Sequence, residues 1–188
     1  MMSEIRGDFV MEALSKLERK IVGWVKDVPH LPVNARKWLG ENIWWITLIG
    51  AILAAIAALV LLGSLFTALA TFGSPVVSYY ASPTFLGWVV VTTAVSLFFM
   101  ILEVLLLSLA ITPLKEKQKK GWVLLFASWL VGVVYAVLTA VLTLNIFLAF
   151  GNLILSAVWI AVSGYFLFEL HSQFAHTEKS KGVKEKKV

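Results

Sequence analysis

The sequence predicts an all-α integral membrane protein, a four-helix transmembrane bundle with an amphipathic interfacial helix in front of it. The first observation is composition: 60% of the 188 residues are hydrophobic, which excludes an ordinary soluble domain. The second is that four apolar stretches each contain the roughly 20 residues that a helix needs to cross a bilayer. These stretches form one transmembrane domain, residues 43–170, and comprise residues 43–71, 84–112, 121–144 and 147–170.

The third observation is that all 16 Lys and Arg residues fall on one side of this bundle. Seven precede Ile43, four lie in the loop 115–120 and five follow Thr177, whereas the turns at 72–83 and 145–152 carry no charge. Basic loops are enriched in the cytoplasm because they are hard to translocate. We therefore expect a multi-pass protein of the plasma or inner membrane with both termini in the cytoplasm. Anionic lipids are the expected partners of this face, and nucleic acid is not, because no recognised binding motif accompanies the charge.

Residues 1–42 are expected to form cytoplasmic amphipathic and juxtamembrane helices. An apolar stripe recurs there at alternating spacings of four and three residues, with charged residues off it. Three interpretations are open: a helix on the inner leaflet, which the Trp and Lys content favours, a short coiled coil, or packing beneath the bundle. Pro29 and Pro32 end this helix, and Asn34 is expected to cap a second helix that continues into the first span. The stripe consists of Val10, Leu14, Leu17, Ile21, Trp24 and Val28.

The segments between and after the spans are predicted to be irregular. Residues 73–83 contain two prolines and a glycine, which is typical of a loop, and the short loop 113–120 makes the second and third spans antiparallel neighbours. Residues 171–188 are predicted to form a basic, disordered cytoplasmic tail. Aromatic residues at the span ends are expected to anchor in the membrane interface; they are Trp44, Trp45, Tyr79, Tyr80 and Trp122.

Small residues predict where the helices pack. Lipid gives no hydrophobic drive for helix association, so contact depends on close backbone approach. The third span has four small residues at intervals of four, and the first span repeats this spacing. We expect packing within the bundle; an interface with a second copy or another membrane protein is the alternative. These seams are Ser128, Gly132, Ala136 and Ala140, and Gly50, Ala54 and Ala58.

Glu103 is the one acidic or basic residue deep inside a predicted span. It precedes Thr112 by nine residues, or roughly 13 Å along a helix. A carboxylate at that depth is costly, so we expect a neutral glutamic acid that is hydrogen-bonded to a hydroxyl. The possible partners are Ser96, Ser128 and Tyr165. Two roles are open: a proton or cation site, or a structural hydrogen bond between helices.

The sequence predicts no catalytic residues, cofactor or metal site. The chain has no Cys, and the spans have no His or Lys, so activated nucleophiles and thiolate ligands are missing. Glu169 and His171 lie on different faces of a helix and are expected to be solvated, and His30 has no evident partner. We expect an interaction or assembly component at the cytoplasmic face, without enzyme activity. A proton- or cation-coupled channel or transporter that uses Glu103 is the alternative.

Overall fold

The computed structural model is all-helical, without strands, over the residues it describes. These are Lys16, Leu17, Lys20, Ile21, Gly23 and residues 29–72, 74–143 and 145–185, with residues 175–185 described by their backbone alone. Four helices are long and apolar enough to cross a membrane, so the chain is a multi-pass membrane protein. The helices are α2 (Val33–Thr71), α3 (Pro75–Tyr80), α4 (Pro83–Lys115), α5 (Lys119–Leu142) and α6 (Ile146–Glu185).

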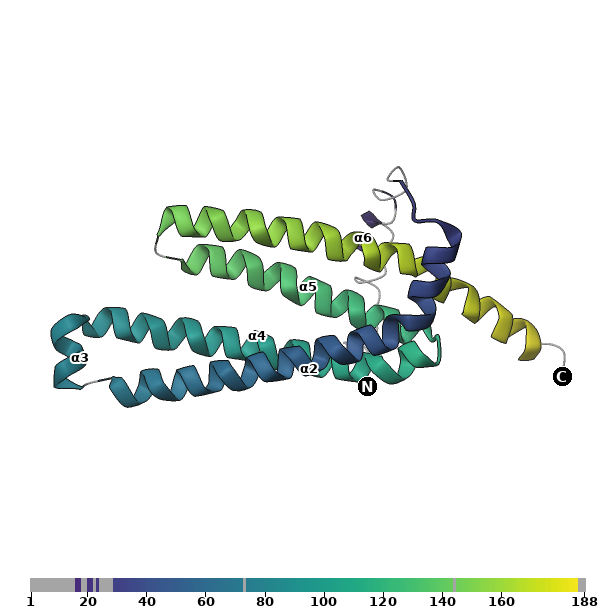
Figure 1. Cartoon of the computed structure of the whole chain (residues 1–188). Coiled ribbons are helices and arrows are strands. Elements are labelled where there is room, and N and C mark those ends of the chain that lie inside the picture. Colours follow the sequence, from purple (N-terminus) through teal and green to yellow (C-terminus); the bar gives the residue numbers. More distant parts are fainter. Residues whose placement is uncertain are drawn as a thin grey trace, which may run out of the picture.

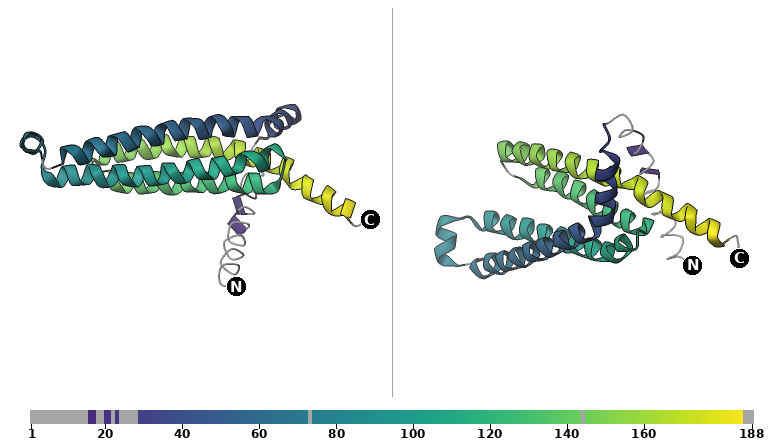
Figure 2. Two further views of the ribbon diagram at one scale, coloured as in Figure 1. Left: turned by 90° about the horizontal axis from the view of Figure 1, so that it is seen from below. Right: turned by 45° about the vertical axis from the view of Figure 1, so that its right-hand side comes forward.

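The four long helices form two hairpins that meet at one end. The short helix α3 connects α2 to α4, and a tight turn connects α5 to α6. The hairpins converge where α4 turns into α5 and separate toward α3 (Figure 1 and the right-hand view of Figure 2). We call the converging end the basic end, because the start of α2 and the turn from α4 to α5 lie there, and these segments contain Arg36, Lys37, Lys115, Lys117, Lys119 and Lys120.

Three helix boundaries differ from the sequence predictions. Helix α2 begins at Val33, with Pro32 in the N-cap position and no side-chain cap, so the predicted Asn34 cap is not formed. The outer loop contains the six-residue helix α3, which starts on Pro75 in the favourable first-turn position. Helix α6 continues to Glu185 through the segment predicted to be irregular. Lys, Glu and Ala in that segment favour helix, and extending an existing helix needs no new nucleus.

Side-chain caps start two of the membrane helices. The Ser82 hydroxyl accepts a hydrogen bond from the Phe85 N–H at 3.2 Å, at the first turn of α4. The Asn145 side-chain carbonyl accepts from the N–H groups of Phe147 at 3.0 Å and Leu148 at 3.2 Å, at the start of α6. The first N–H groups of a helix have no partner within it. These caps therefore satisfy donors at the membrane ends where the chain turns.

The turn between α4 and α5 is a Schellman motif that ends in a close backbone contact. The Gln118 N–H donates to the Pro113 carbonyl at 2.8 Å and the Lys117 N–H to the Leu114 carbonyl at 3.0 Å. Lys117 adopts a left-handed conformation with φ of 55°. A Cβ on Gly121 would stand 2.7 Å from the Leu114 nitrogen, so only glycine fits there. This glycine allows α5 to start directly against the end of α4.

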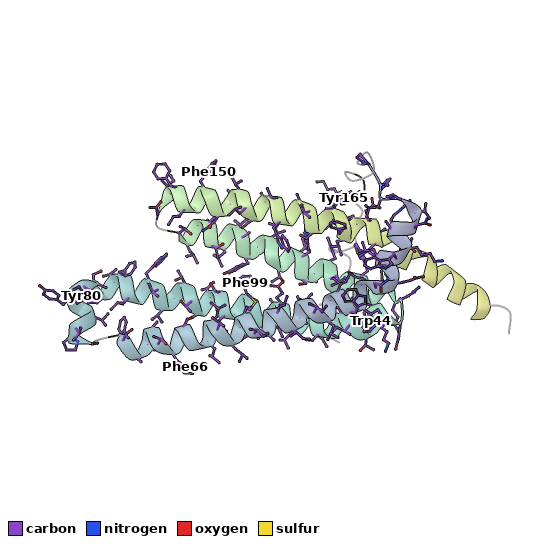
Figure 3. The ribbon with its side chains drawn as sticks, in the orientation of Figure 1. Trp44, Phe66, Tyr80, Phe99, Phe150 and Tyr165 are labelled. Carbon is purple, nitrogen blue, oxygen red and sulfur yellow. The ribbon has the colours of Figure 1, made fainter. Side chains whose placement is uncertain are left out.

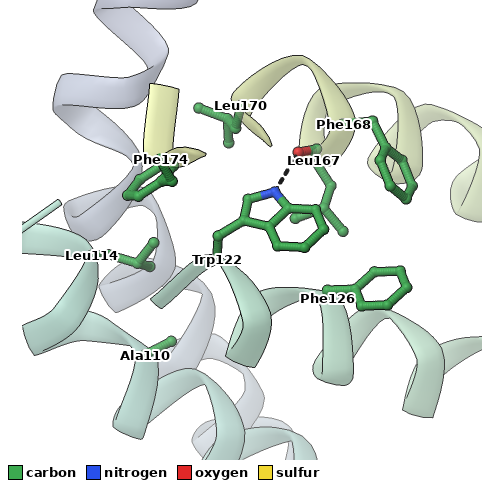
Figure 4. Packing of buried hydrophobic residues seen from close by; sticks show 8 residues of the cluster. All are labelled: Ala110, Leu114, Trp122, Phe126, Leu167, Phe168, Leu170 and Phe174. Atoms are coloured by element: carbon green, nitrogen blue, oxygen red, sulfur yellow. Dashed lines mark hydrogen bonds between the residues drawn. The ribbon is translucent and has the colours of Figure 1, made fainter. Parts of the chain in front are cut away.

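The buried core lies at the basic end and is organised around Trp122 (Figure 4). The Trp122 side chain is 1% exposed, its indole N–H donates to the Leu167 carbonyl at 2.9 Å, and its ring stacks on Phe126. Trp122 is therefore a core residue, and its assignment to an interfacial belt is wrong. The indole N–H bonds to a backbone carbonyl of α6, so its hydrogen-bond donor is satisfied without water. The cluster comprises Ala110, Leu114, Trp122, Phe126, Leu167, Phe168, Leu170 and Phe174.

The other aromatic residues that were predicted to be anchors lie near the two ends of the hairpins, and their anchoring in a membrane interface stays a prediction. Trp44 packs against the buried cluster, and the Lys115 ammonium lies 5.3 Å from its ring centroid. Tyr79 and Tyr80 are strongly exposed on α3, at the opposite end of the molecule from Trp44 (Figure 3). Aromatic side chains therefore mark both ends of the hairpins.

Most of the predicted N-terminal helix lies outside the described residues. Two members of its apolar stripe are described, and both are helical. Leu17 is exposed, whereas Ile21 is partly buried against the cluster around Trp122. This contact places Ile21 at the basic end of the bundle. The other members, Val10, Leu14, Trp24 and Val28, are not described.

Candidate functional site

A cavity of about 780 Å³ lies between the two hairpins. Helix α2 contributes Leu39, Ile43 and Ile46, and α4 contributes Glu103. Helices α5 and α6 supply the remaining walls, which are mainly apolar. Their lining residues are Leu125, Ser128, Trp129, Gly132, Tyr135, Ala136, Thr139, Leu155, Ser156, Trp159, Ile160, Ser163, Phe166, Leu167 and Leu170. The size lies within the range of roughly 300–1,000 Å³ that is usual for small-molecule sites.

The small-residue seam of α5 faces this cavity. Ser128, Gly132 and Ala136 line it, and Ala140 does not. A Cβ on Gly132 would meet no atom within 4 Å, so no neighbouring helix approaches there. The expected close packing within the chain is therefore not formed at Gly132. The small residues of α5 leave open space between the hairpins at this point. The alternative, contact with a second copy, stays a prediction.

The seam of α2 packs in part. A Cβ on Gly50 would also meet no atom within 4 Å, whereas Ala54 and Ala58 are partly buried. The residues of α2 that are most deeply buried in this region are Thr47 and Ala51, one position away from the predicted register. Close approach therefore occurs on an adjacent line of the helix. Period-four spacing alone did not fix which line faces α4.

Glu103 lines the cavity without a hydrogen bond. Among the described residues, none donates to its carboxyl group. Two of the three expected partners, Ser96 and Tyr165, are bonded elsewhere. Ser96 Oγ accepts a hydrogen bond from the Tyr135 hydroxyl at 3.0 Å, and the Tyr165 hydroxyl donates to the Pro29 carbonyl at 2.8 Å. The third, Ser128, lines the same cavity and has no hydrogen bond to the described residues. A carboxyl and a hydroxyl thus face the cavity with unused hydrogen-bonding capacity.

Aromatic rings form part of the cavity wall. The Trp129 indole N–H donates to the Ile160 carbonyl at 3.1 Å, which fixes the ring across α6. The ring of Tyr135 contacts Phe99 of α4, with centroids 5.4 Å apart. Trp159 is largely exposed on α6 and also lines the cavity. Such faces attract cations, most strongly where water is excluded.

A second polar cluster lies at the basic end of the cavity, where the sequence predicted solvated groups. The Glu169 side chain is 1% exposed, and its Oε1 lies 2.7 Å from His30 Nδ1. Its Oε2 lies 3.6 Å from Arg36 Nε, and neither of these two atoms has a hydrogen-bond partner. The expectations of a solvated Glu169 and an unpartnered His30 are wrong. The contact joins residues 139 apart, so no local spacing signals it.

The two polar clusters differ in what they can do chemically. Within the described part of the chain, no three His, Asp or Glu side chains gather in a way that could hold a metal ion. Glu103 offers an acceptor or a negative charge to a molecule inside the cavity. Glu169 joins the start of α2 to α6. The chain was compared with known protein-family models, curated proteins and solved structures, and none of them matches.

Proposed function

We propose that the protein is a membrane carrier that binds an apolar cation in the cavity between its hairpins, with Glu103 as the counter-charge. The observation that carries this proposal is the Glu103 carboxyl, which faces the cavity without a partner among the described residues. A polar group within a bilayer is costly when it is unpaired, and acids in such places commonly mark ion or proton paths. A bound cation would supply the missing partner.

The lining favours a cation over an anion or a neutral lipid. Among the described residues that line the cavity, Glu103 is the only acidic or basic one, so an anion would find no counter-charge there. Trp129, Tyr135 and Trp159 present aromatic faces that attract positive charge. The remaining wall is mainly apolar, with a few hydroxyl side chains, and suits a hydrocarbon or aromatic body. The proposed ligand class is therefore a compact amphiphile with a single positive charge.

Two probe ions of similar shape and opposite charge test this proposal. Tetraphenylphosphonium and tetraphenylborate are titrated into the purified protein in lipid nanodiscs. We expect the cation to bind and Glu103→Gln to weaken it by about tenfold or more, since the buried charge pair is lost. The matched control is Glu41→Gln, which changes an exposed carboxylate of α2 outside the cavity. Equal binding of both ions, or unchanged binding in Glu103→Gln, would refute the proposal.

Carriage is tested separately from binding. The protein is reconstituted in liposomes, and uptake of the cation is followed after a membrane potential is applied. Because this cation also crosses lipid by itself, the initial rate of uptake is compared, and we expect a rate above that of protein-free liposomes that falls to the protein-free rate in Glu103→Gln. Binding without uptake would reduce the proposal to a membrane receptor for the ion.

We further propose that the basic end faces the cytoplasm and contacts anionic lipid. Support comes from the basic side chains that the fold gathers at that end, and from the charge bias of loops in membrane proteins. Lys37→Cys and Tyr80→Cys, made one at a time and treated with a membrane-impermeant maleimide outside intact cells, test the orientation. We expect labelling at position 80 and not at position 37. Labelling of position 37 from outside would refute it.

An interaction or assembly role at that face is the second candidate function. The packing of Ile21 against the core at the basic end supports it, because this residue of the predicted amphipathic stripe then lies beside the basic surface. Removing residues 1–28 should weaken sedimentation of the protein with vesicles that contain anionic lipid. Unchanged vesicle binding would argue against a role for this segment.

A further inference from the structure

We propose that residues 29–43 form a strap that closes the basic end of the cavity, and that Glu169 is the latch that holds the strap to α6. This inference rests on the cavity of the proposed function and does not depend on which ligand binds there. The strap comprises the segment before α2 and the first turns of that helix. It lies against α6 at the end where the hairpins converge (Figure 1).

Two hydrogen bonds fasten the strap where α2 begins. The Tyr165 hydroxyl donates to the Pro29 carbonyl at 2.8 Å, and His30 Nδ1 lies 2.7 Å from Glu169 Oε1. Tyr165 and Glu169 are four residues apart on α6, so they lie on one face of that helix. Consecutive residues of the strap are thus held by consecutive turns of α6.

The strap also forms part of the cavity wall. Leu39 and Ile43 line the cavity opposite Leu167 and Leu170 of α6. Between them, Gly40 is buried so closely against α6 that its Cβ would stand 3.1 Å from Gln173 Cγ. The strap is therefore in direct contact with α6 at the basic end. Moving it away would open the cavity there.

The contacts of Glu169 with the strap are only partly satisfied. The Glu169 carboxylate is buried, yet its Oε2 and Arg36 Nε lie 3.6 Å apart without hydrogen-bond partners. Burying charged groups that are only partly satisfied offsets much of the attraction between them. The one good hydrogen bond of Glu169 goes to His30, which is half exposed to water. The polar contacts that hold the closed state are consequently few among the described residues, and they end on residues 29–36, whereas residues 39–43 add only apolar packing and the close approach of Gly40 to Gln173.

The absence of cysteine from the chain permits a direct test. Gly132→Cys places one thiol in the cavity, at a position with open space around it. Its reaction with a membrane-impermeant maleimide is timed in proteoliposomes. Tyr165→Phe should speed labelling by about two- to tenfold, the change expected when one net hydrogen bond is lost from the closed state. Glu169→Met, which keeps the volume but removes the latch, should speed it at least as much.

A reverse experiment locks the strap. A Cβ on Gly40 would lie 3.3 Å from the Gln173 Cβ, slightly closer than the Cβ atoms of a disulfide usually lie. Oxidation of Gly40→Cys with Gln173→Cys should slow labelling of the Gly132→Cys thiol, and reduction should restore it. Mass spectrometry verifies which thiols are paired before labelling.

Controls separate opening from unfolding. Ala51→Cys carries a thiol at a buried position of α2 that lies outside the strap and does not line the cavity. Its labelling should not respond to the latch variants, because this position becomes accessible only when the helices come apart. Equal acceleration at 51, or unchanged labelling at 132 in both latch variants, would overturn the strap proposal. A failure of cation binding with an intact labelling response would refute the proposed carrier and leave the strap standing.

Discussion

The indole of Trp129 lies so close to Gly164 that a Cβ at position 164 would stand 3.1 Å from its Cζ2 atom. The same ring donates a hydrogen bond to the Ile160 carbonyl, one turn earlier on α6. Glycine therefore provides the recess in which the ring lies. The recess also positions one wall of the cavity, because Trp129 lines it.

Gly164→Leu should displace Trp129 and destabilise the protein by about 1–3 kcal/mol, the usual penalty of overpacking. Gly151→Leu is the matched control, since a Cβ on Gly151 of the same helix meets nothing within 4 Å. Thermal unfolding of both variants in detergent gives the comparison. Equal unfolding midpoints for the two would show that Trp129 is not confined by Gly164.

Gly121→Ala should destabilise the α4–α5 turn, because the new Cβ would meet the Leu114 backbone nitrogen at 2.7 Å. Backbone cannot move aside as a flexible side chain can, so we expect a loss of about 1–3 kcal/mol. Gly132→Ala on the same helix should instead gain about 0.5–1 kcal/mol, because alanine favours helix and has open space there. Opposite shifts of the unfolding midpoint are the expected result, and shifts of the same sign would contradict it.

Trp122→Phe should cost about 2–4 kcal/mol, because it removes a hydrogen bond and leaves space in the buried cluster. The lost bond is the one from the indole N–H to the Leu167 carbonyl. Trp159→Phe, at a side chain that is 73% exposed, should change stability little. Unfolding by denaturant in mixed micelles measures both. A larger effect at position 159 would mean that the core is centred elsewhere.

Lys117→Gly should stabilise the protein by about 1 kcal/mol, because glycine adopts the left-handed conformation without the Cβ penalty. Lys117 has φ of 55° at the end of α4. Lys119→Gly removes the same charge from the first turn of α5, where glycine brings no such relief and should not stabilise. A stabilisation of equal size in both variants would point to charge repulsion in the loop as its cause.

The membrane helices could be predicted from sequence because their signal is local. Long apolar runs and the polar turns between them place the spans of α4 and α5 within a few residues of their observed bounds. The start of α2 was less accessible, since Pro32 takes the N-cap position and no capping side chain announces it. The short helix α3 was hidden by its prolines, which suit a loop and a first helical turn equally well.

The sites could be predicted only in part. Glu103 is conspicuous because charge is rare within an apolar run, but its surroundings depend on how the two hairpins meet. The seam through Gly132 is the same pattern whether a helix or an open space lies opposite. The contact between His30 and Glu169 spans 139 residues, and it forms only because the chain returns at the basic end. Tertiary arrangement decided each of these outcomes, and no local pattern encodes it.

Because the hairpins converge at a single end, a small rotation between them there produces a large displacement at their far ends. Helix α5 has 24 residues and extends about 36 Å from the turn where it begins, so a rotation of about 10° there displaces its far end by about 6 Å. The compact cluster around Trp122 lies at the point about which the hairpins would rotate, and the strap lies beside it. If release of the Glu169 contact lets the hairpins rotate about this cluster, the space between their far ends changes in width by several ångströms, although the contact itself lies at the basic end.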